Sequence, residues 1–166
     1  MTTVLLRPEL PHDHGAIHEL TEAAFRDMPY SDGDEADLVD KLRDAGDLSL
    51  SLVAEDGGQI VGHIAFSPVT ISDGTQGWYG LGPVSVIPRL QKQGIGFRLI
   101  QRGIADMRES GAKGIVLLGD PQYYARFGFR HEPQLTYPGA PAEYFQAVVL
   151  DGDLPTGEVR YTPAFG

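Results

Sequence analysis

Cysteine is missing from this chain of 166 residues. Its absence excludes disulfide bonds and cysteine-based metal sites, and it also excludes an acyl transfer that passes through a cysteinyl thioester. Long hydrophobic runs are missing too. The run at residues 115–118 is one of the longest, whereas a membrane-spanning helix needs about 20 apolar residues. A hydrophobic content of 42% then predicts one soluble globular domain, residues 1–166.

Positive charge is also scarce, with 13 Lys and Arg residues against 23 Asp and Glu and a formal net charge of −10. Nucleic-acid binding without sequence preference needs a cationic surface, so we expect no nucleic-acid partner. The negative net charge is compatible with a cationic acceptor, and it is equally explained by a simple requirement for solubility. Residues 1–10 lack a basic segment followed by a long apolar stretch, which predicts a cytoplasmic protein that is neither exported nor bound to a membrane.

Hydrophobic periodicity predicts an α/β fold. Alternating or continuous apolar segments predict strands at residues 4–7, 48–55, 59–71, 78–86, 114–119, 145–150 and 157–161, the last two completing the sheet. Helical spacing predicts a first helix with Asp13 as N-cap, a second that ends at Gly46, a third over 94–109 and a short one ended by Gly128. The sequence Asp-Gly-Gly at 56–58 predicts a hairpin turn, and 133–142 a loop.

Five acidic residues crowd the start of the second predicted helix: Asp32, Asp34, Glu35, Asp37 and Asp40. Carboxylates near a helix N-terminus stabilise the helix, so this charge requires no function. The alternative interpretation is that part of it lines the entrance for an acceptor.

The most informative segment runs from residue 81 to residue 129, where an apolar strand is followed by the sequence QKQGIG and an amphipathic helix. A turn of this kind aims unpaired backbone N–H groups and the positive end of a helix at one point, which is a seat for phosphate. Gly94 and Gly96 carry no side chain that would hold phosphates away from that backbone. The segment therefore predicts a ligand with a pyrophosphate.

The spacing argues against two common nucleotide motifs. A Walker loop requires Lys and Ser or Thr after its last glycine, where this chain has Phe97 and Arg98. A dinucleotide fingerprint requires a third glycine or alanine where Leu99 stands, and its turn begins at the end of the strand. Because Asp120 lies about 20 residues on, where a ribose-binding acid is expected, a nucleotide-dependent oxidoreductase stays open as an alternative.

Two motifs in this segment resemble those of the GNAT superfamily of acyl-CoA N-acyltransferases. Residues 91–96 (QKQGIG) match the signature Q/R-x-x-G-x-G/A, and residues 124–129 (YARFGF) match the later element Y-x-x-x-G-F. About 28 residues separate the two, which is room for one helix and one strand, as in that family. The segments LGDPQYYARFGF and GHIAFSPV are similar to those of a bacterial subfamily whose acceptors are largely unassigned.

The resemblance implies a mixed, mostly antiparallel central sheet flanked by helices, with acetyl-CoA as co-substrate and no metal. It implies that Val84 and Val86 offer their main chain to the pantetheine arm, while Ser85 points the other way. Arg89, Lys92 and Arg98 could reach the phosphates or could be ordinary solvated surface bases. The pyrophosphate itself would lie on the backbone of Gln91, Lys92, Gln93, Gly94, Ile95 and Gly96.

The second motif selects Tyr124 as proton donor to the departing thiolate, because a phenol stays protonated at neutral pH. Two alternatives stay open: Tyr124 packs in the core, or Tyr123 donates instead. The family pattern often carries an Asn upstream of this tyrosine, and this chain departs from it with the sequence Gly-Asp-Pro at 119–121.

The predicted strand at 78–86 contains no carboxylate that could serve as the base. His63, on the neighbouring predicted strand, is the strongest single candidate because an unperturbed imidazole titrates near neutral pH. Glu35 and Asp120 are alternatives, as is a chain of water molecules. A lone His in an alternating strand can also be purely structural.

We therefore expect an acetyl-CoA-dependent N-acetyltransferase that acetylates a primary amine of a small molecule or peptide by direct transfer in a ternary complex. The alternative from another class is a catalytically silent CoA-binding sensor or partner module. Neither the acceptor nor the length of the acyl group follows from the sequence, and a homodimer is an open alternative to a monomer.

Overall fold

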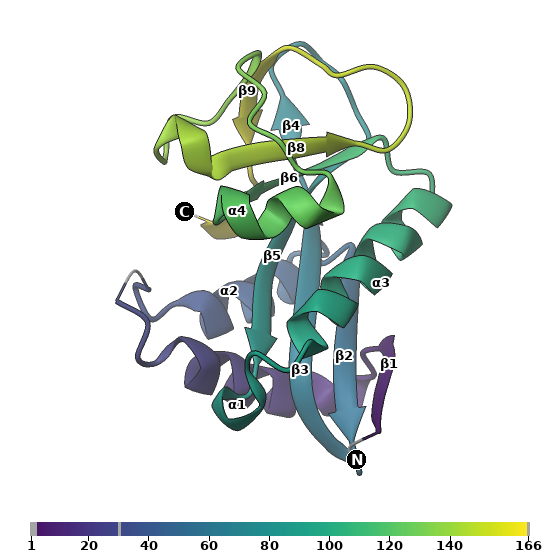
Figure 1. Ribbon diagram of the computed structural model, residues 1–166, viewed down its shortest axis with the longest axis vertical. Helices are drawn as coiled ribbons and strands as arrows, with labels where there is room; N and C mark the ends of the chain where they lie inside the picture. Colours follow the sequence, from purple (N-terminus) through teal and green to yellow (C-terminus); the bar gives the residue numbers. More distant parts are fainter. Residues whose placement is uncertain (1–2, 30, 166) are drawn as a thin grey trace. The chain divides into compact units, whose positions relative to one another are not determined.

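The computed structural model describes residues 3–29 and 31–165 and is shown in Figure 1. The chain forms two compact units. Unit 1 comprises Met1–Phe66 and Gly82–Ile104, and unit 2 comprises Ser67–Leu81 and Ala105–Gly166. The single domain over residues 1–166 stays a prediction, and its residues 1, 2, 30 and 166 lie outside the described part of the chain.

Unit 1 is built on antiparallel strands. The strands β1 (Val4–Pro8), β2 (Leu50–Asp56) and β3 (Gln59–Pro68) are neighbours in this order, and the C-terminal half of β5 (Trp78–Val86) follows β3. The remaining elements of this unit are the helices α1 (His14–Phe25), α2 (Glu35–Asp44) and most of α3 (Ile95–Glu109), with the short 3-10 turns η1 (Pro11–Asp13) and η2 (Pro88–Leu90).

The predicted hairpin turn joins β2 to β3. Asp56 pairs with Gln59, so the loop has only two residues, Gly57 and Gly58, with φ angles of 57° and 86°. Two left-handed residues in a row form the turn whose twist matches that of the flanking strands. Glycine adopts this conformation without a steric penalty, and the hairpin prediction is confirmed.

The two faces of the unit 1 strands are covered by different helices. A side chain added at Gly62 of β3 would meet Ile95 and Leu99, so this face packs on α3, which crosses in front of the strands in Figure 1. Val53 of β2 instead belongs to a buried cluster with Ile17, Leu20, Val39 and Ile60, so α1 and α2 cover the opposite face. Side chains alternate along β3, but the register shift between Ala54 and Glu55 interrupts the alternation, so Ile60 and Gly62 face different helices although they are two residues apart.

Unit 2 contains one larger and one smaller set of strands. The N-terminal half of β5 pairs in parallel with β6 (Gly114–Leu118), and β6 pairs antiparallel with β8 (Phe145–Val149). Around these strands lie α4 (Pro121–Tyr124) and the 3-10 turns η3 (Ala125–Phe127), η4 (Ala142–Tyr144) and η5 (Pro163–Phe165). The core of the unit is a buried cluster of Val69, Ile71, Trp78, Val116, Leu135, Phe145, Ala147 and Val159.

A second sheet of three short strands corrects part of the sequence prediction. The strand expected over 59–71 ends at Pro68, which has no N–H to donate, and Thr70–Ile71 forms a separate strand β4. β9 (Gly157–Arg160) does not complete the central sheet but pairs with β4 and with β7 (Leu135–Thr136), a strand inside the expected loop. The predicted fold class is nevertheless confirmed, because the chain is a mixed α/β fold with mostly antiparallel pairs flanked by helices.

Asp13 occupies the position before α1, but its carboxylate does not cap that helix as predicted. It accepts hydrogen bonds from Arg7 Nη1 at 2.7 Å and from the Leu10 N–H at 2.7 Å, and it is only 3% exposed. Arg7 also donates to Glu55 at 2.9 Å. A charged guanidinium is a stronger donor than a helix amide, so the carboxylate turns toward Arg7.

We expect the Arg7–Asp13 pair to make stability depend on acid pH. The hydrogen bond from Arg7 lowers the pKa of Asp13 from 3.8 to about 2. The stabilisation is therefore fully present above about pH 4 and is lost as the pH falls through about 2. In denaturant titrations, the difference in unfolding free energy between wild type and Asp13→Asn should shrink between pH 4 and pH 2. A difference that stays constant with pH would contradict this account.

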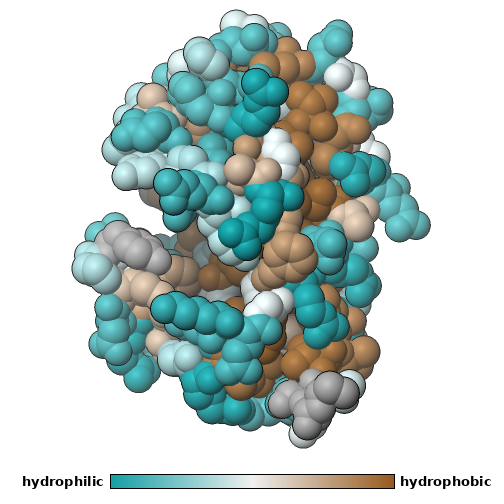
Figure 2. Space-filling model, in the orientation of Figure 1, coloured by the Kyte–Doolittle hydropathy of each residue, from teal (hydrophilic) through white to brown (hydrophobic). Residues whose placement is uncertain are grey.

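None of the helices in the described residues combines the length and the apolar character of a membrane span. Figure 2 shows hydrophobic residues at the surface of both units among a hydrophilic majority. The exposed large hydrophobic side chains include Leu5 at 56% in unit 1 and Leu118 at 43% in unit 2. Scattered apolar residues of this kind are common on water-exposed surfaces.

Candidate functional site

The loop between β5 and α3 has an unusual backbone. Lys92 (φ 65°) and Gly94 (φ 89°) are left-handed, and Lys92 is the one non-glycine residue with a positive φ in the described chain. The Arg98 N–H donates to the Gly94 carbonyl at 3.0 Å, so helical hydrogen bonding begins at Gly94. The N–H groups of Ile95 and Gly96 consequently have no acceptor within the helix. This is the backbone form in which helix starts bind phosphate.

The Gln91 side chain fastens this loop to the strand that precedes it. Its Nε2 donates to the Val86 carbonyl at 3.0 Å, and Gln91 is half-buried. Gln93 makes a longer bond of 3.5 Å to the Arg89 carbonyl. The first glutamine of the QKQGIG motif therefore holds the loop in shape, a role that the sequence motif alone did not suggest.

The two glycines of the motif meet different requirements. Gly94 needs its left-handed φ, a conformation that other residues adopt only with strain. Gly96 has ordinary helical geometry and open space, since an added Cβ would find Val86 Cγ2 at 3.7 Å as its nearest neighbour. Gly96 is thus the position at which a side chain can be introduced without disturbing the fold.

The basic residues near the loop have partners of their own. Arg89 Nη2 donates to Gln59 Oε1 at 2.9 Å, and Arg98 Nη2 donates to the Val4 carbonyl at 3.1 Å. Lys92 is exposed, on the left-handed residue of the loop. A contact from Lys92 to phosphate stays a prediction, while Arg89 and Arg98 would first have to give up these bonds.

The β5 residues alternate as predicted for the strand beside the donor. Val84 and Val86 are half-buried, whereas Ser85 is 1% exposed. An added Cβ at Gly96 of α3 would meet the Val86 side chain, so Val86 faces α3 and Ser85 faces the opposite side of the strands. A main-chain role of Val84 and Val86 toward pantetheine stays a prediction.

Tyr124 lies in unit 2, at the end of α4, within an aromatic group. Its ring centroid is 5.0 Å from that of Tyr123 and 6.0 Å from that of Phe129, in edge-on arrangements. Tyr123 has the Arg126 guanidinium over its ring at 4.3 Å, and burial raises the pKa of Tyr123. The two tyrosines are therefore held in different surroundings, and the role of Tyr124 as acid stays a prediction.

Gly119 explains one departure of the sequence from the family pattern. A Cβ at this position would overlap the Tyr124 ring, so the glycine leaves room for that ring against the end of β6. Asp120, which follows it, acts as the N-cap of α4 and accepts from the Gln122 N–H at 3.0 Å. The Gly-Asp-Pro sequence thus positions the helix that carries Tyr124.

His63 is fully buried in β3, in unit 1. Its Nε2 lies 2.8 Å from Ser51 Oγ, and its Nδ1 has no hydrogen-bond partner among the described residues. Burial lowers the pKa of His63 to about 4, so the imidazole is neutral near pH 7. The His63 side chain is therefore a neutral imidazole inside unit 1. Its catalytic role stays a prediction.

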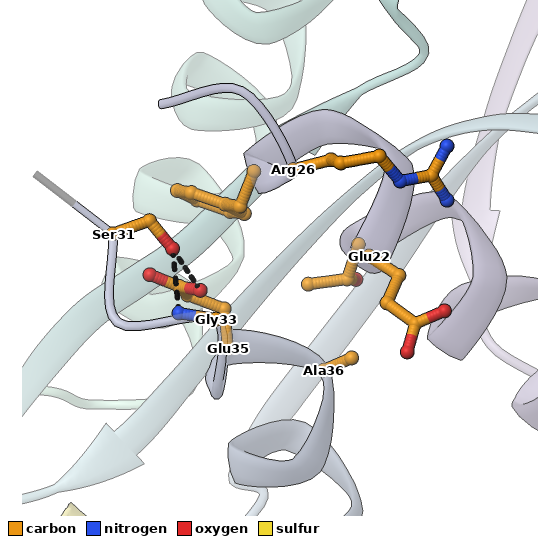
Figure 3. A pocket seen from close by; sticks show the side chains of 8 residues that line it. Glu22, Arg26, Ser31, Gly33, Glu35 and Ala36 are labelled. Atoms are coloured by element: carbon orange, nitrogen blue, oxygen red, sulfur yellow. Dashed lines mark hydrogen bonds between the residues drawn. The ribbon is translucent and has the colours of Figure 1, made fainter. Parts of the chain in front are cut away.

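The acidic segment lines a cavity in unit 1, shown in Figure 3. The cavity has a volume of about 320 Å³ and lies between α1 and α2, where Thr21, Phe25 and Ala36 are among its lining residues. Glu35 turns toward Ser31, whose hydroxyl donates to it at 2.7 Å, while the charged ends of Glu22 and Arg26 point away from that pair. Glu35 as base stays a prediction.

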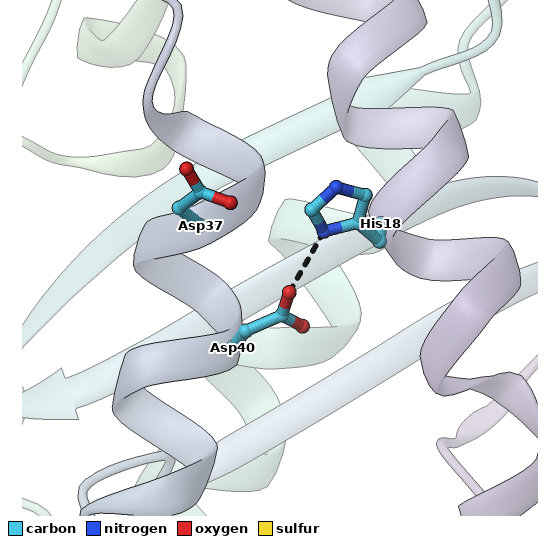
Figure 4. Close-up of side chains that lie close together, drawn as sticks. All are labelled: His18, Asp37 and Asp40. Atoms are coloured by element: carbon cyan, nitrogen blue, oxygen red, sulfur yellow. Dashed lines mark hydrogen bonds and ion pairs between the residues drawn. The ribbon is translucent and has the colours of Figure 1, made fainter.

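His18, Asp37 and Asp40 bring potential metal-ligand atoms to within 4.8 Å of one another on α1 and α2, as Figure 4 shows. Asp40 is engaged twice: His18 Nδ1 lies 2.7 Å from one oxygen and Arg43 Nη1 3.2 Å from the other. The hydrogen bond to Asp40 raises the pKa of His18, which favours the protonated imidazole over a metal ligand. His18, Asp40 and Arg43 therefore form an ion-pair network.

The comparisons with known proteins decide the family. A family model described as "Acetyltransferase (GNAT) family" matches residues 15–129. The chain belongs to the GNAT family of acetyltransferases. It is 36% identical to the uncharacterized N-acetyltransferase YhbS of Escherichia coli K12, over 98% of both chains. The family resemblance drawn from the two sequence motifs is confirmed, and with it the prediction that the protein is an acetyltransferase rather than a nucleotide-dependent oxidoreductase.

Two solved GNAT structures resemble the whole chain. A GNAT acetyltransferase from Brucella melitensis, solved with acetyl-CoA, is 50% identical, covers 99% of both chains and superposes with a TM-score of 0.89. YhbS from Escherichia coli, solved with CoA, is 34% identical and superposes with a TM-score of 0.90, over 99% of this chain and 93% of that one.

The sequence could not indicate the polar network around His63. Ser51 and Glu9 are ordinary residues in ordinary strand and turn contexts, and 42 residues separate them. Their connection depends on strand register, which brings β2 beside β3 and the end of β1 near both. The one signal available beforehand was the position of a polar residue, Ser51, between Leu50 and Leu52 in the predicted strand.

Proposed function

We propose that this GNAT protein transfers an acetyl group from acetyl-CoA to a primary amine of a small molecule or peptide, directly within a ternary complex. The observation that carries the proposal is the loop at the start of α3, with its left-handed Gly94 and its helix N–H groups that have no acceptor within the helix. Two relatives that match this chain over nearly its whole length were solved with acetyl-CoA and with CoA. These two ligands support acetyl-CoA as the donor for this chain.

Two segments, the loop at residues 91–96 and strand β5, would bind different parts of the donor. The backbone of residues 91–96 would hold the pyrophosphate, with Gln91 keeping the loop against Val86. The main-chain groups of β5 at Val84 and Val86 would bind the pantetheine arm as a neighbouring strand does. Such binding places the thioester for attack, and positioning of this kind can supply a large part of the rate acceleration.

The transfer itself needs two proton movements. The neutral amine attacks the thioester carbonyl, so a C–N bond forms and the amine releases one proton to a base. The C–S bond then breaks, and the thiolate takes a proton from the phenol of Tyr124, which solvent restores. No cysteine exists in the chain, so an acyl-cysteine intermediate is excluded, and direct transfer is the simplest route.

Two measurements on the wild-type protein test this proposal. In thermal unfolding, acetyl-CoA at about 100 times its dissociation constant should raise the melting temperature by roughly 5–10 °C, whereas NAD and ATP should not. Thiol release in the presence of a panel of primary amines should identify acceptors that are turned over. Stabilisation by CoA with no thiol release from any amine would favour the silent CoA-binding module, and stabilisation by NAD alone would overturn the proposal.

A further inference from the structure

Glu9, Ser51 and His63 form one connected line of polar groups inside unit 1. The Ser51 hydroxyl is hydrogen-bonded to Glu9 Oε1 and lies 2.8 Å from His63 Nε2. Arg43 fixes Glu9 with two bonds of 2.9 and 3.0 Å. His14 Nε2 lies 3.1 Å from the second Glu9 oxygen and is 42% exposed. The line therefore begins at the fully buried imidazole and ends beside solvent.

The donors and acceptors in this line determine which atom carries each proton. Burial raises the pKa of Glu9, but the hydrogen bonds from Arg43 and Ser51 outweigh this effect and hold the pKa of Glu9 below its ordinary value, so Glu9 is ionised and only accepts. The single Ser51 proton must then go to Glu9. The Ser51 oxygen accepts in turn from His63, whose proton is therefore on Nε2.

His63 Nδ1 is left with a bare lone pair. The imidazole is neutral, because burial lowers its pKa to about 4, and the charged groups acting on it are Glu9 and Arg43. Among the described residues Nδ1 has no hydrogen-bond partner. A base held by a second group that is itself oriented by a carboxylate is the arrangement that nucleophilic and acid–base sites share.

Strand pairing places β5 beside the strand that carries His63. The Ile87 N–H donates to the Val61 carbonyl at 2.8 Å, which makes these two residues antiparallel partners. Continuing the pairing by two residues places Ser85 opposite His63. Gly62 and Val86 both face α3, so Ser85 and His63 share the other face. Ser85 is also buried, 1% exposed, and its Oγ, like His63 Nδ1, has no hydrogen-bond partner among the described residues, so these two facing atoms are not bonded to each other in the ligand-free protein.

We propose that Ser85, His63, Ser51 and Glu9 carry the acceptor's proton away from β5, the strand proposed to hold the donor arm. The inference rests on the proposed function. In this step the Ser85 side chain rotates so that its hydroxyl donates to His63 Nδ1, and the ammonium gives a proton to Ser85 Oγ while the Ser85 proton moves to His63 Nδ1. The Nε2 proton then moves to Ser51 as the Ser51 proton moves to Glu9, from which solvent removes it. Ser51 and Glu9 are positioning residues, since they act through His63.

The test compares acceptors that differ in basicity. For a strongly basic alkylamine, protonated at pH 7, Ser85→Ala and Ser51→Ala should each lower kcat/KM by about 100-fold, the lower end of what general base catalysis contributes. For a weakly basic amine such as an aniline or a hydrazine, already neutral at pH 7, the loss should be less than about threefold. Ser67→Ala removes a buried serine hydroxyl of β3 that is not part of the relay. This variant should change kcat/KM for neither class of amine. Equal losses with both classes of amine would mean a purely structural role and would overturn the proposal.

A second measurement does not need turnover. Nitrogen-15 NMR of the His63 ring in the wild-type protein should show a neutral imidazole protonated on Nε2 from pH 5 to pH 8. In Ser51→Ala that tautomer preference should weaken, because the acceptor of the Nε2 proton is gone. A proton on Nδ1 in the wild type, or an imidazolium at pH 7, would overturn the relay even if the protein proved to be a CoA-binding module without transferase activity.

Discussion

Gly96→Asp should abolish the stabilisation that CoA gives this protein and leave the ligand-free protein at least as stable as wild type. The nearest atom to a new Cβ at Gly96 is 3.7 Å away, so the side chain fits. A carboxylate in the first turn of α3 also interacts favourably with the helix dipole. The same charge would repel the pyrophosphate, and we expect the affinity for CoA to fall at least about 100-fold, or roughly 2.7 kcal/mol.

The control for this prediction is Gly96→Ala, which adds the Cβ without the charge and should bind CoA within a few-fold of wild type. Gly94→Asp is a poorer test, because φ at Gly94 is 89° and any side chain there adds strain. Isothermal titration with CoA and thermal unfolding without ligand would separate binding from folding. If Gly96→Asp bound CoA as tightly as Gly96→Ala, the pyrophosphate would have to lie elsewhere.

Tyr124→Phe should lower the turnover number by about 10²–10⁴-fold, the range typical of general acid catalysis, with CoA affinity nearly unchanged. The substitution removes only the hydroxyl and keeps the ring between Tyr123 and Phe129. Single-turnover thiol release with a good acceptor is the appropriate measurement, because it isolates the step in which the thiolate leaves.

Two further variants sharpen the test of Tyr124. Tyr123→Phe should retain most activity, since its ring still packs under Arg126. Gly119→Ala should lower turnover in the same direction as Tyr124→Phe, because the added methyl would displace the Tyr124 ring while every hydroxyl is kept. Full activity of Tyr124→Phe on a good acceptor would leave solvent as the proton donor.

Elements with strong local patterns could be predicted from the sequence. The strand at 78–86 and the glycine hairpin are found where apolar alternation and turn chemistry place them, and the third helix begins one residue later than predicted. The small sheet was missed because its pairing depends on contacts distant in sequence. Ser72 Oγ accepts from the Glu158 N–H, and Asp73 from the Thr156 N–H, across more than 80 residues.

In the candidate site, too, the features with a local sequence pattern could be predicted and those that depend on distant contacts could not. Short motifs pointed to residues 91–96 and to Tyr124, because their chemistry depends on local backbone and adjacent residues. The surroundings of His63 could not be predicted, since its burial, its lowered pKa and its link to Glu9 arise from the packing of three strands. A lone histidine in a strand pattern carries no information on which nitrogen bears the proton.

The bond from Gln91 to the Val86 carbonyl has a thermodynamic consequence for donor recognition. A loop that is ordered only when its ligand arrives loses conformational entropy at that moment, and this loss weakens binding. Here the side chain orders the loop when the chain folds, so the entropy is lost before the donor is met. Donor association should accordingly show a smaller entropic penalty and a heat-capacity change that reflects the surface buried rather than a segment folding on its ligand.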